Sequence, residues 1–274
     1  MLFRSPVIPL IGLIFLVYDF APVAQIAPGV FRHPGFELSR VMEFMMLEYD
    51  GMTGLIIEVF ATYVVIFVIV GAFLQKTGLG LLFIDATYRL TGQRTGGPGL
   101  TAVVSSGLFG MISGSGVANV VTTGTFTIPL MKRVGYRPEF AGAVEAAAST
   151  GGTYMPPIMG AGAFLLAQLT ETSYFHVIKI ALIPAILYYL SVGFMVYLRA
   201  VRRGLHGVPA EELPPWGNIV PRLHLLLPIP VMVYYLIIGD SAFLAAVKTI
   251  FLIVLLKTSD LLSEVRTPWS GRTG

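Results

Sequence analysis

One stretch of this chain is apolar enough for a membrane and yet contains residue types that can bind an ion. Residues 107–124 read Gly-Leu-Phe-Gly-Met-Ile-Ser-Gly-Ser-Gly-Val-Ala-Asn-Val-Val-Thr-Thr-Gly, inside an uncharged run between Arg94 and Lys132. A passive transmembrane anchor has no use for the small, flexible residues 113–116 at its centre. A backbone that unwinds there, at membrane depth, offers carbonyl and hydroxyl oxygens to an ion or a polar solute.

A second interruption follows within residues 139–168, which contain no lysine or arginine. The sequence Ser149-Thr-Gly-Gly-Thr-Tyr-Met-Pro-Pro157 lies in the middle of this stretch. Two glycines followed by two prolines remove hydrogen-bond donors and break the helical ladder. The pattern therefore predicts a discontinuous helix.

Together the two interruptions supply the kind of oxygen that a hard, weakly held cation needs, without fixed charge. Helix N-termini attract anions, and unwound carbonyls coordinate cations such as sodium. The side chains that add oxygens are Ser113, Ser115, Asn119, Thr122, Thr123, Ser149, Thr150 and Thr153. The alternative is that small and hydroxylated residues only let helices pack closely, and packing is our preferred interpretation for Ser105, Ser106, Thr125 and Thr127.

Glu145 is a candidate coupling acid, because it lies one to two turns before the second interruption and is expected to be embedded in the membrane. Two interpretations remain open. The carboxyl group takes part in coupling or proton relay, or it is hydrogen-bonded to a neighbouring helix or lies near the cytoplasmic edge, since Arg137 is eight residues away.

The composition predicts an all-α, polytopic membrane protein. Hydrophobic residues make up 55% of the chain, charged residues 12%, and the mean hydropathy is +0.79. Soluble domains carry roughly 25% charged residues. The net charge of +3 comes from short basic clusters between apolar runs, where topology rules place them, so nucleic acid is not an expected partner. The absence of cysteine excludes disulfides, zinc–thiolate sites and thiol nucleophiles.

We expect six crossings, one re-entrant hairpin and a polar tail. Basic loops, which prefer the cytoplasm, flank the hairpin at both ends, and its arms of about 13 to 15 residues, or roughly 20 Å of helix, are too short to cross. This topology puts the N-terminus in the cytoplasm. Lys248 faces protein or snorkels, and the sequence does not decide between the two. The crossings are expected at residues 6–21, 54–74, 139–168 (the broken helix), 176–198, 223–238 and 242–256, the hairpin at 100–131 and the tail at 263–274.

An enzyme is not expected. The two serines at residues 113 and 115 lack the spacing of an intramembrane serine protease, no histidine lies at mid-membrane, and the H-E-x-x-H metal motif is absent, so no transition metal is expected either. A channel is the more serious alternative, because glycine-rich re-entrant loops also form filters. The long broken helix is more typical of a transporter.

Three linked motifs resemble the large membrane subunit of TRAP transporters, the DctM-like permease family. They are Gly110-Met-Ile-Ser-Gly-Ser-Gly-Val-Ala-Asn119, Ile128-Pro-Leu-Met-Lys-Arg-Val-Gly-Tyr136 and Ala146-Ala-Ala-Ser-Thr-Gly-Gly-Thr-Tyr-Met-Pro-Pro157. The resemblance covers nearly the whole chain. The chain looks most like the fused permeases in which a small four-helix subunit precedes the large one. Such permeases are commonly paired with TAXI-type binding proteins.

The resemblance implies sodium-coupled, secondary-active uptake (symport) of organic acids by an elevator motion in the bacterial or archaeal cytoplasmic membrane, with protons still open as the coupling ion. The family's first hairpin maps onto residues 100–131 and its first broken helix onto residues 139–168. The implied sodium site comprises Ser113, Gly114, Ser115, Gly116, Thr150, Gly151, Gly152, Thr153 and Pro156. The implied solute site comprises Ser115, Gly116, Asn119 and Thr123.

The chain departs from the family in one respect. These permeases carry two inverted halves, and only one hairpin and one broken helix are found in residues 1–262. We therefore expect one half of an inverted-repeat transporter, from a gene fragment or a split gene. The expected partners are a TAXI-type periplasmic binding protein, a small TRAP membrane subunit or its fused equivalent, the second half of the large domain, and the lipid bilayer. The alternative is a non-transporting membrane scaffold or fragment.

Overall fold

The structure is a computed structural model that describes residues 6–26, 28–48, 51 and 54–266. The chain divides into two units, Met1–Val59 and Phe60–Gly274, and each is described by itself. Every regular element in the described ranges is a helix, and one isolated bridge joins Phe20 to Phe36. The expectation of an all-α protein is confirmed for this part of the chain.

The first unit consists of short helices. They are α1 (Val7–Asp19), α2 (Ala21–Ala24), the 3-10 turn η2 (Gly29–Phe31), α3 (Leu38–Leu47) and α4 (Leu55–Val59). The Phe36 N–H donates to the Asp19 carbonyl oxygen at 2.8 Å, which ties the segment before α3 to the end of α1. With 13 residues, α1 is about 20 Å long, which is shorter than the ~30 Å hydrocarbon core. The helix found where a crossing was predicted, at residues 6–21, is therefore too short to cross the hydrocarbon core in a straight line.

The second unit begins with a π-helix and two α-helices and continues into a helical hairpin. These elements are η3 (Phe60–Val64), α5 (Val65–Lys76), α6 (Leu79–Thr91), α7 (Gly97–Ser113) and α8 (Gly116–Arg133). The last two helices form the predicted hairpin, and residues 113–116 are its tip. Gly114 adopts the left-handed conformation (φ +58°) that ends α7, and the Ser115 side chain caps α8 by accepting the Ala118 N–H.

The predicted discontinuous helix is also present. It consists of α9 (Pro138–Gly151), the 3-10 turn η4 (Gly152–Tyr154) and α10 (Ala161–Leu169). Residues 152–160, called the break below, connect α9 to α10. Pro156 and Pro157 have no N–H to donate there, and Met159 has a positive φ of 56°, so the helix cannot continue.

The remaining elements lead to the C-terminal part of the chain. They are α11 (Tyr174–Arg203), η5 (Ala210–Glu212), α12 (Trp216–Ile219), η6 (Val220–Leu226), α13 (Pro228–Ile237) and α14 (Ala242–Arg266). The predicted polar tail begins inside a helix, since α14 continues to Arg266, and residues 267–274 lie outside the described residues.

Four helical stretches of the described residues are long and apolar enough to cross a membrane. They are Leu55–Lys76, Tyr174–Arg203, Ala210–Ile237 and Ala242–Ser259. The stretch at Ala210–Ile237 begins before the predicted start of the crossing at residues 223–238. The total of six crossings stays a prediction.

Lys248 faces protein. Its Nζ lies 2.6 Å from the Asp240 carboxylate and 4.4 Å from the centroid of the Tyr235 ring. A cation in an apolar helix thus has both a counter-ion and an aromatic face.

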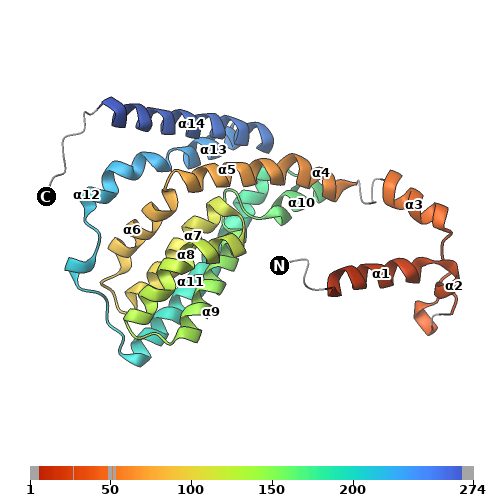
Figure 1. Ribbon diagram of the computed structural model, residues 1–274, viewed down its shortest axis with the longest axis horizontal. Helices are drawn as coiled ribbons and strands as arrows, with labels where there is room; N and C mark the ends of the chain where they lie inside the picture. Colours follow the sequence, from red (N-terminus) through yellow and green to blue (C-terminus); the bar gives the residue numbers. More distant parts are fainter. Residues whose placement is uncertain (1–5, 27, 49–50, 52–53, 267–274) are drawn as a thin grey trace. The chain divides into compact units, whose positions relative to one another are not determined.

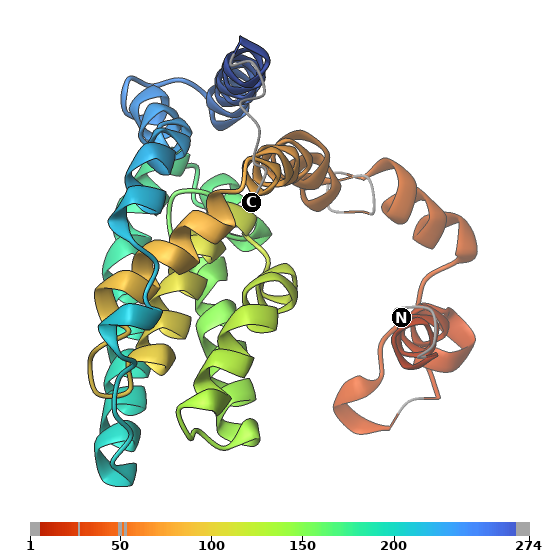
Figure 2. The same ribbon diagram turned by 60° about the vertical axis from the view of Figure 1, so that its left-hand side comes forward.

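Four helices of the second unit pack side by side and hold the hairpin against the broken helix (Figures 1 and 2). These helices are α7, α8, α9 and α11. Their shared core contains mostly small and aliphatic side chains: Ala102, Val103, Met131, Tyr136, Ala141, Val144, Ala148, Val196 and Ala200. Small side chains let the helix backbones approach closely.

Candidate functional site

The hairpin tip meets the break and the last turn of α9 backbone to backbone. A Cβ atom on Gly114 would lie 2.2 Å from the Met159 carbonyl oxygen, and a Cβ atom on Gly116 would lie 3.2 Å from the Ser149 carbonyl oxygen. No side chain fits at the first of these contacts. The two interruptions of the sequence are thus brought into direct contact by the fold.

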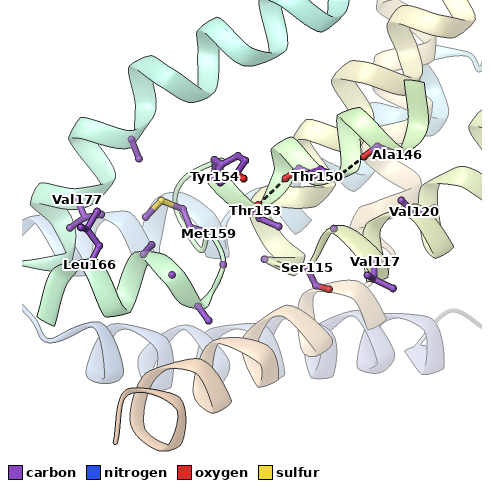
Figure 3. Close-up of a pocket in the computed structure, with 17 residues that line it drawn as sticks. Ser115, Val117, Val120, Ala146, Thr150, Thr153, Tyr154, Met159, Leu166 and Val177 are labelled. Atoms are coloured by element: carbon purple, nitrogen blue, oxygen red, sulfur yellow. Dashed lines mark hydrogen bonds between the residues drawn. The ribbon is translucent and has the colours of Figure 1, made fainter. Parts of the chain in front are cut away.

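A cavity of about 760 Å³ lies beside this contact (Figure 3). Its wall is made by the tip and the start of α8, the end of α9, the break, α10 and one face of α11. None of the lining side chains is charged. They are Gly114, Ser115, Gly116, Val117, Val120, Ala146, Thr150, Thr153, Tyr154, Met159, Gly160, Ala161, Gly162, Ala163, Leu166, Val177 and Ala181.

Two helix N-termini open into the cavity. The first turn of α8 contributes Gly116 and Val117, and the first turn of α10 contributes residues 161–163. The N-cap residue of α10 is Gly160, which has no side chain to satisfy the first N–H groups. Because a helix N-terminus carries partial positive charge, the otherwise uncharged wall favours an anionic group.

Hydroxyl groups on the cavity wall donate their protons to backbone carbonyls. Thr150 Oγ1 donates to the Ala146 oxygen and Thr153 Oγ1 to the Thr150 oxygen, both at 2.8 Å (Figure 3). At the tip, Ser113 Oγ donates to the Ser115 oxygen at 3.3 Å. Each hydroxyl oxygen keeps lone pairs free. These oxygens are the ligand type that a hard cation takes.

The structure brings together some of the residues predicted for the site and not others. Gly114, Ser115, Gly116, Thr150 and Thr153 line the cavity. Three further candidates are buried and are not among the lining residues: Gly151, Gly152 and Pro156. Ser113, the first residue of the tip and the last of α7, is also outside the cavity wall.

Asn119 and Thr123, two of the residues predicted for the solute site, are not among the residues that line the cavity. Both are fully buried. The Asn119 amide donates to the Ser106 carbonyl oxygen at 2.7 Å, and the Thr123 hydroxyl lies 3.0 Å from Asn119 Oδ1. The reason is their spacing of four residues, which places both on the face of α8 that packs against α7 and α9.

Glu145 is also fully buried, and four hydroxyl groups surround its carboxyl group. Oε1 lies 3.0 Å from Ser106 Oγ and 3.1 Å from Ser149 Oγ, and it also accepts from Thr123. Oε2 accepts from Thr127. Of the two interpretations of Glu145, hydrogen bonding to neighbouring helices is what the fold shows, and a coupling role stays a prediction.

Packing was the preferred interpretation of Ser106 and Thr127, whereas both contact the Glu145 carboxyl group. A signal was available for one of them. Residues 119, 123 and 127 are spaced by four and therefore share one face of α8. A buried carboxyl group needs such a row of donors on a facing helix.

Three tyrosines of α11 also hold the broken helix, and nothing in the sequence pointed to them. The Tyr188 hydroxyl donates to the Ala147 oxygen at 2.8 Å and the Tyr189 hydroxyl to the Ala148 oxygen at 2.7 Å. The Tyr174 hydroxyl donates to the carbonyl oxygens of the break itself, at Pro157 (2.9 Å) and Ile158. Aromatic residues are common in apolar helices, so only the packing of α11 on α9 reveals this role.

Comparison with known proteins identifies the family. A family model for the "Tripartite ATP-independent periplasmic transporter, DctM component" matches residues 1–267. The chain belongs to this family. The resemblance to DctM-like permeases, which was based on motifs in the hairpin and the broken helix, is thereby confirmed.

Curated DctM relatives are similar to this chain at moderate identity. The "C4-dicarboxylate TRAP transporter large permease protein DctM" of Pseudomonas aeruginosa is 28% identical over 186 residues, which is 65% of this chain and 43% of that protein. The "Isethionate TRAP transporter permease protein DctMQ" of Oleidesulfovibrio alaskensis is 28% identical over 61% of this chain and 26% of its own length. The "Sialic acid TRAP transporter large permease protein SiaM" of Vibrio cholerae is 27% identical over 52% of this chain and 33% of its own length. The matched part of this DctM-family chain thus spans less than half of each relative.

Proposed function

We propose that this chain is part of the membrane permease of a binding-protein-dependent secondary transporter that takes up organic acids with sodium as the coupling ion. The observation that carries the proposal is the cavity between the hairpin tip and the break, which offers helix N-termini and uncharged oxygens side by side.

The helix N-termini favour a carboxylate or a chemically similar anion as the solute. The α8 and α10 N-termini provide backbone N–H groups and partial positive charge to the cavity, which has no cationic side chain. The relatives named for C4-dicarboxylate, isethionate and sialic acid all have anionic solutes in their names, which supports this class. The aliphatic lining, which includes Val117 and Leu166, suits a small organic body behind the anionic group.

The hydroxyl and carbonyl oxygens at the tip and the break favour sodium. Ser115, Thr150 and Thr153 present hydroxyl oxygens to the same cavity, and the backbone at the tip and the break is not fully used by helix hydrogen bonds. Neutral oxygens bind a monovalent cation weakly enough to release it again, as a transport cycle requires. A proton remains the alternative coupling ion.

Family membership and the length of the relatives support the coarser part of the proposed partners, namely a binding protein, a small membrane subunit and a longer large domain. We propose a periplasmic binding protein of the TAXI type, a small TRAP membrane subunit or its fused equivalent, and a second half of the large domain that supplies the rest of the solute site. The proposed location is the cytoplasmic membrane of a bacterium or archaeon, with the N-terminus inside.

Cysteine accessibility in proteoliposomes tests the proposal. Because the chain has no cysteine, Ser115→Cys provides one labelling site on the cavity wall. We expect a membrane-impermeant thiol reagent to label it, and sodium together with a carboxylate such as succinate to slow the labelling at least several-fold. The matched control is Ser241→Cys, an exposed serine between α13 and α14, whose labelling is expected to be indifferent to sodium.

Three results would contradict the proposal. Ser115→Cys that no reagent reaches from either side would place the tip in packing and favour a non-transporting scaffold. Labelling that sodium and carboxylates leave unchanged would do the same. Labelling that many unrelated ions slow equally would favour a channel-like pore.

A further inference from the structure

The Glu145 carboxyl group lies among helices that bring no opposite charge to it. Helix α7 contains no ionisable residue, and the only ionisable residues of α8 are Lys132 and Arg133 in its last turn. On α9 itself the other acid is Glu139, which is exposed in the first turn and pairs with Arg137. From α11 the titratable group that faces Glu145 is Tyr189, whose hydroxyl donates to the Ala148 oxygen. A fully buried carboxyl group therefore has neutral hydroxyls as its partners.

These hydroxyls can donate hydrogen bonds to an ionised carboxylate. Ser106, Thr123 and Ser149 point their oxygens at Oε1, and Thr127 does so at Oε2. If each donates its proton, the carboxylate accepts four hydrogen bonds and both oxygens are satisfied. Donors on α7, α8 and α9 thus meet at one group.

The same atoms can also satisfy the hydrogen bonds of a protonated carboxyl group. A proton on Oε2 can be donated to Thr127 Oγ1, provided that Thr127 turns its own proton elsewhere. An acceptor is in place, because the Thr123 carbonyl oxygen lies 3.0 Å from Thr127 Oγ1. Thr123 has its own second acceptors in the Asn119 carbonyl oxygen at 2.9 Å and Asn119 Oδ1 at 3.0 Å. Only hydrogen atoms rotate between the two arrangements, and no polar group is left unsatisfied in either.

We propose that Glu145 is a reversible proton-binding site inside the helical bundle, and that its hydroxyl shell holds the ionised and the protonated carboxyl group without a change in helix packing. The proton binds to Oε2, and the only bond that forms is the O–H bond of the carboxyl group. The site is separate from the cavity, since neither Glu145 nor its four hydroxyl partners line it. The proposal does not depend on transport and can fail or succeed independently of the proposed function.

Infrared difference spectroscopy of the full chain in proteoliposomes tests this site. A protonated carboxyl group has a C=O stretching band that a carboxylate lacks. We expect a band of this kind that appears and disappears reversibly with pH while the far-ultraviolet circular dichroism stays constant. It should be lost in Glu145→Gln, which keeps the size and hydrogen bonding of the group, and retained in Glu139→Gln, the matched control on the same helix. Potentiometric titration should find one proton fewer per chain in Glu145→Gln.

Two threonines of α8 show whether the hydroxyl shell is involved. Thr127→Val removes the partner of Oε2 and is expected to shift the frequency of the Glu145 band. Thr125→Val is the control, because its hydroxyl is exposed and donates to the Thr122 oxygen of its own helix. If Glu145→Gln does not fold, a carbon-13 label on glutamate carboxyl groups identifies the band in the unmodified chain, and the Thr127→Val shift then carries the assignment.

Four outcomes would overturn the proposal. The first is the absence of a Glu145 band at every pH at which the helices stay folded, which would mean permanent ionisation. The second is a band that never disappears, which would mean a permanently neutral group. The third is a band that appears only as the helices unfold. The fourth is a band that Thr127→Val and Thr125→Val affect in the same way.

Discussion

A Cβ atom on Gly110 would lie 2.3 Å from the Cα atom of Gly152, so the hairpin and the broken helix touch there with no side chain between them. An alanine at position 152 would be equally constrained, because its Cβ atom would lie 2.6 Å from the Cα atom of Gly110. This contact lies one turn of α7 away from the tip. Neither position therefore has room for a methyl group.

Gly152→Ala is expected to destabilise the chain by overpacking, at a cost of about 1–3 kcal/mol. Gly142→Ala on α9 is the control, because an added Cβ there meets no atom within 4 Å, and the better helix propensity of alanine should stabilise by up to ~1 kcal/mol. Denaturant or thermal unfolding in detergent micelles measures both. Equal and small effects of the two variants would show that the backbone contact is not close.

Tyr174→Phe should loosen the break. The variant keeps the stacking of this ring on Phe164, at a centroid distance of 4.4 Å, but leaves the Pro157 and Ile158 carbonyl oxygens without their donor. The expected loss is about 1–3 kcal/mol. Hydrogen–deuterium exchange should become faster at residues 158–160 and stay unchanged in Tyr234→Phe, an exposed tyrosine of α13. Unchanged exchange at the break in Tyr174→Phe would argue against this role.

Lys248 and Asp240 should be coupled energetically. The side chains are 36% and 20% exposed, so the ion pair is partly shielded from water. A double-mutant cycle with Lys248→Met and Asp240→Asn is expected to give a coupling free energy of about 1 kcal/mol, at the upper end for exposed pairs. The cycle is measured by unfolding at low and high salt. A coupling free energy near zero at both salt concentrations would mean that Lys248 is held by the Tyr235 ring alone.

The folded chain is expected to lose stability in alkali because of Tyr136, which lies in the connection between α8 and α9. Burial raises the pKa of its hydroxyl from 10 to about 12. Since the raised pKa belongs to the folded state, the protonated phenol stabilises the fold fully below pH 10, and this contribution is lost as the pH rises through about 12. Relative to Tyr136→Phe, which does not titrate, the unmodified chain should lose stability over this window. Parallel stability profiles of the two proteins would contradict the prediction.

Sequence reasoning located the hairpin and the broken helix but placed their ends a few residues inside the observed limits. Helix α7 begins at Gly97 and not at residue 100, because Gly96 takes a left-handed conformation (φ +69°) and Pro98 fits the first turn of a helix. Helix α14 continues to Arg266, past the predicted start of the tail, because polar residues at the end of a helix do not by themselves stop it. Such ends depend on local turn geometry that composition describes poorly.

The amino-acid sequence by itself determined that the chain is a helical membrane protein with two glycine-rich interruptions, because long uncharged runs and Gly-Gly and Pro-Pro pairs act locally on solvation and on the helical hydrogen-bond ladder. Only the tertiary structure decided which polar side chains face the cavity and which face Glu145. Thr150 and Ser149 are neighbours in sequence, yet Thr150 lines the cavity and Ser149 donates to the buried carboxyl group. The physical reason is that successive residues of a helix point in different directions. Their roles are therefore set by the packing of α7, α8 and α11 around α9, which brings together groups as distant in sequence as Ser106 and Glu145.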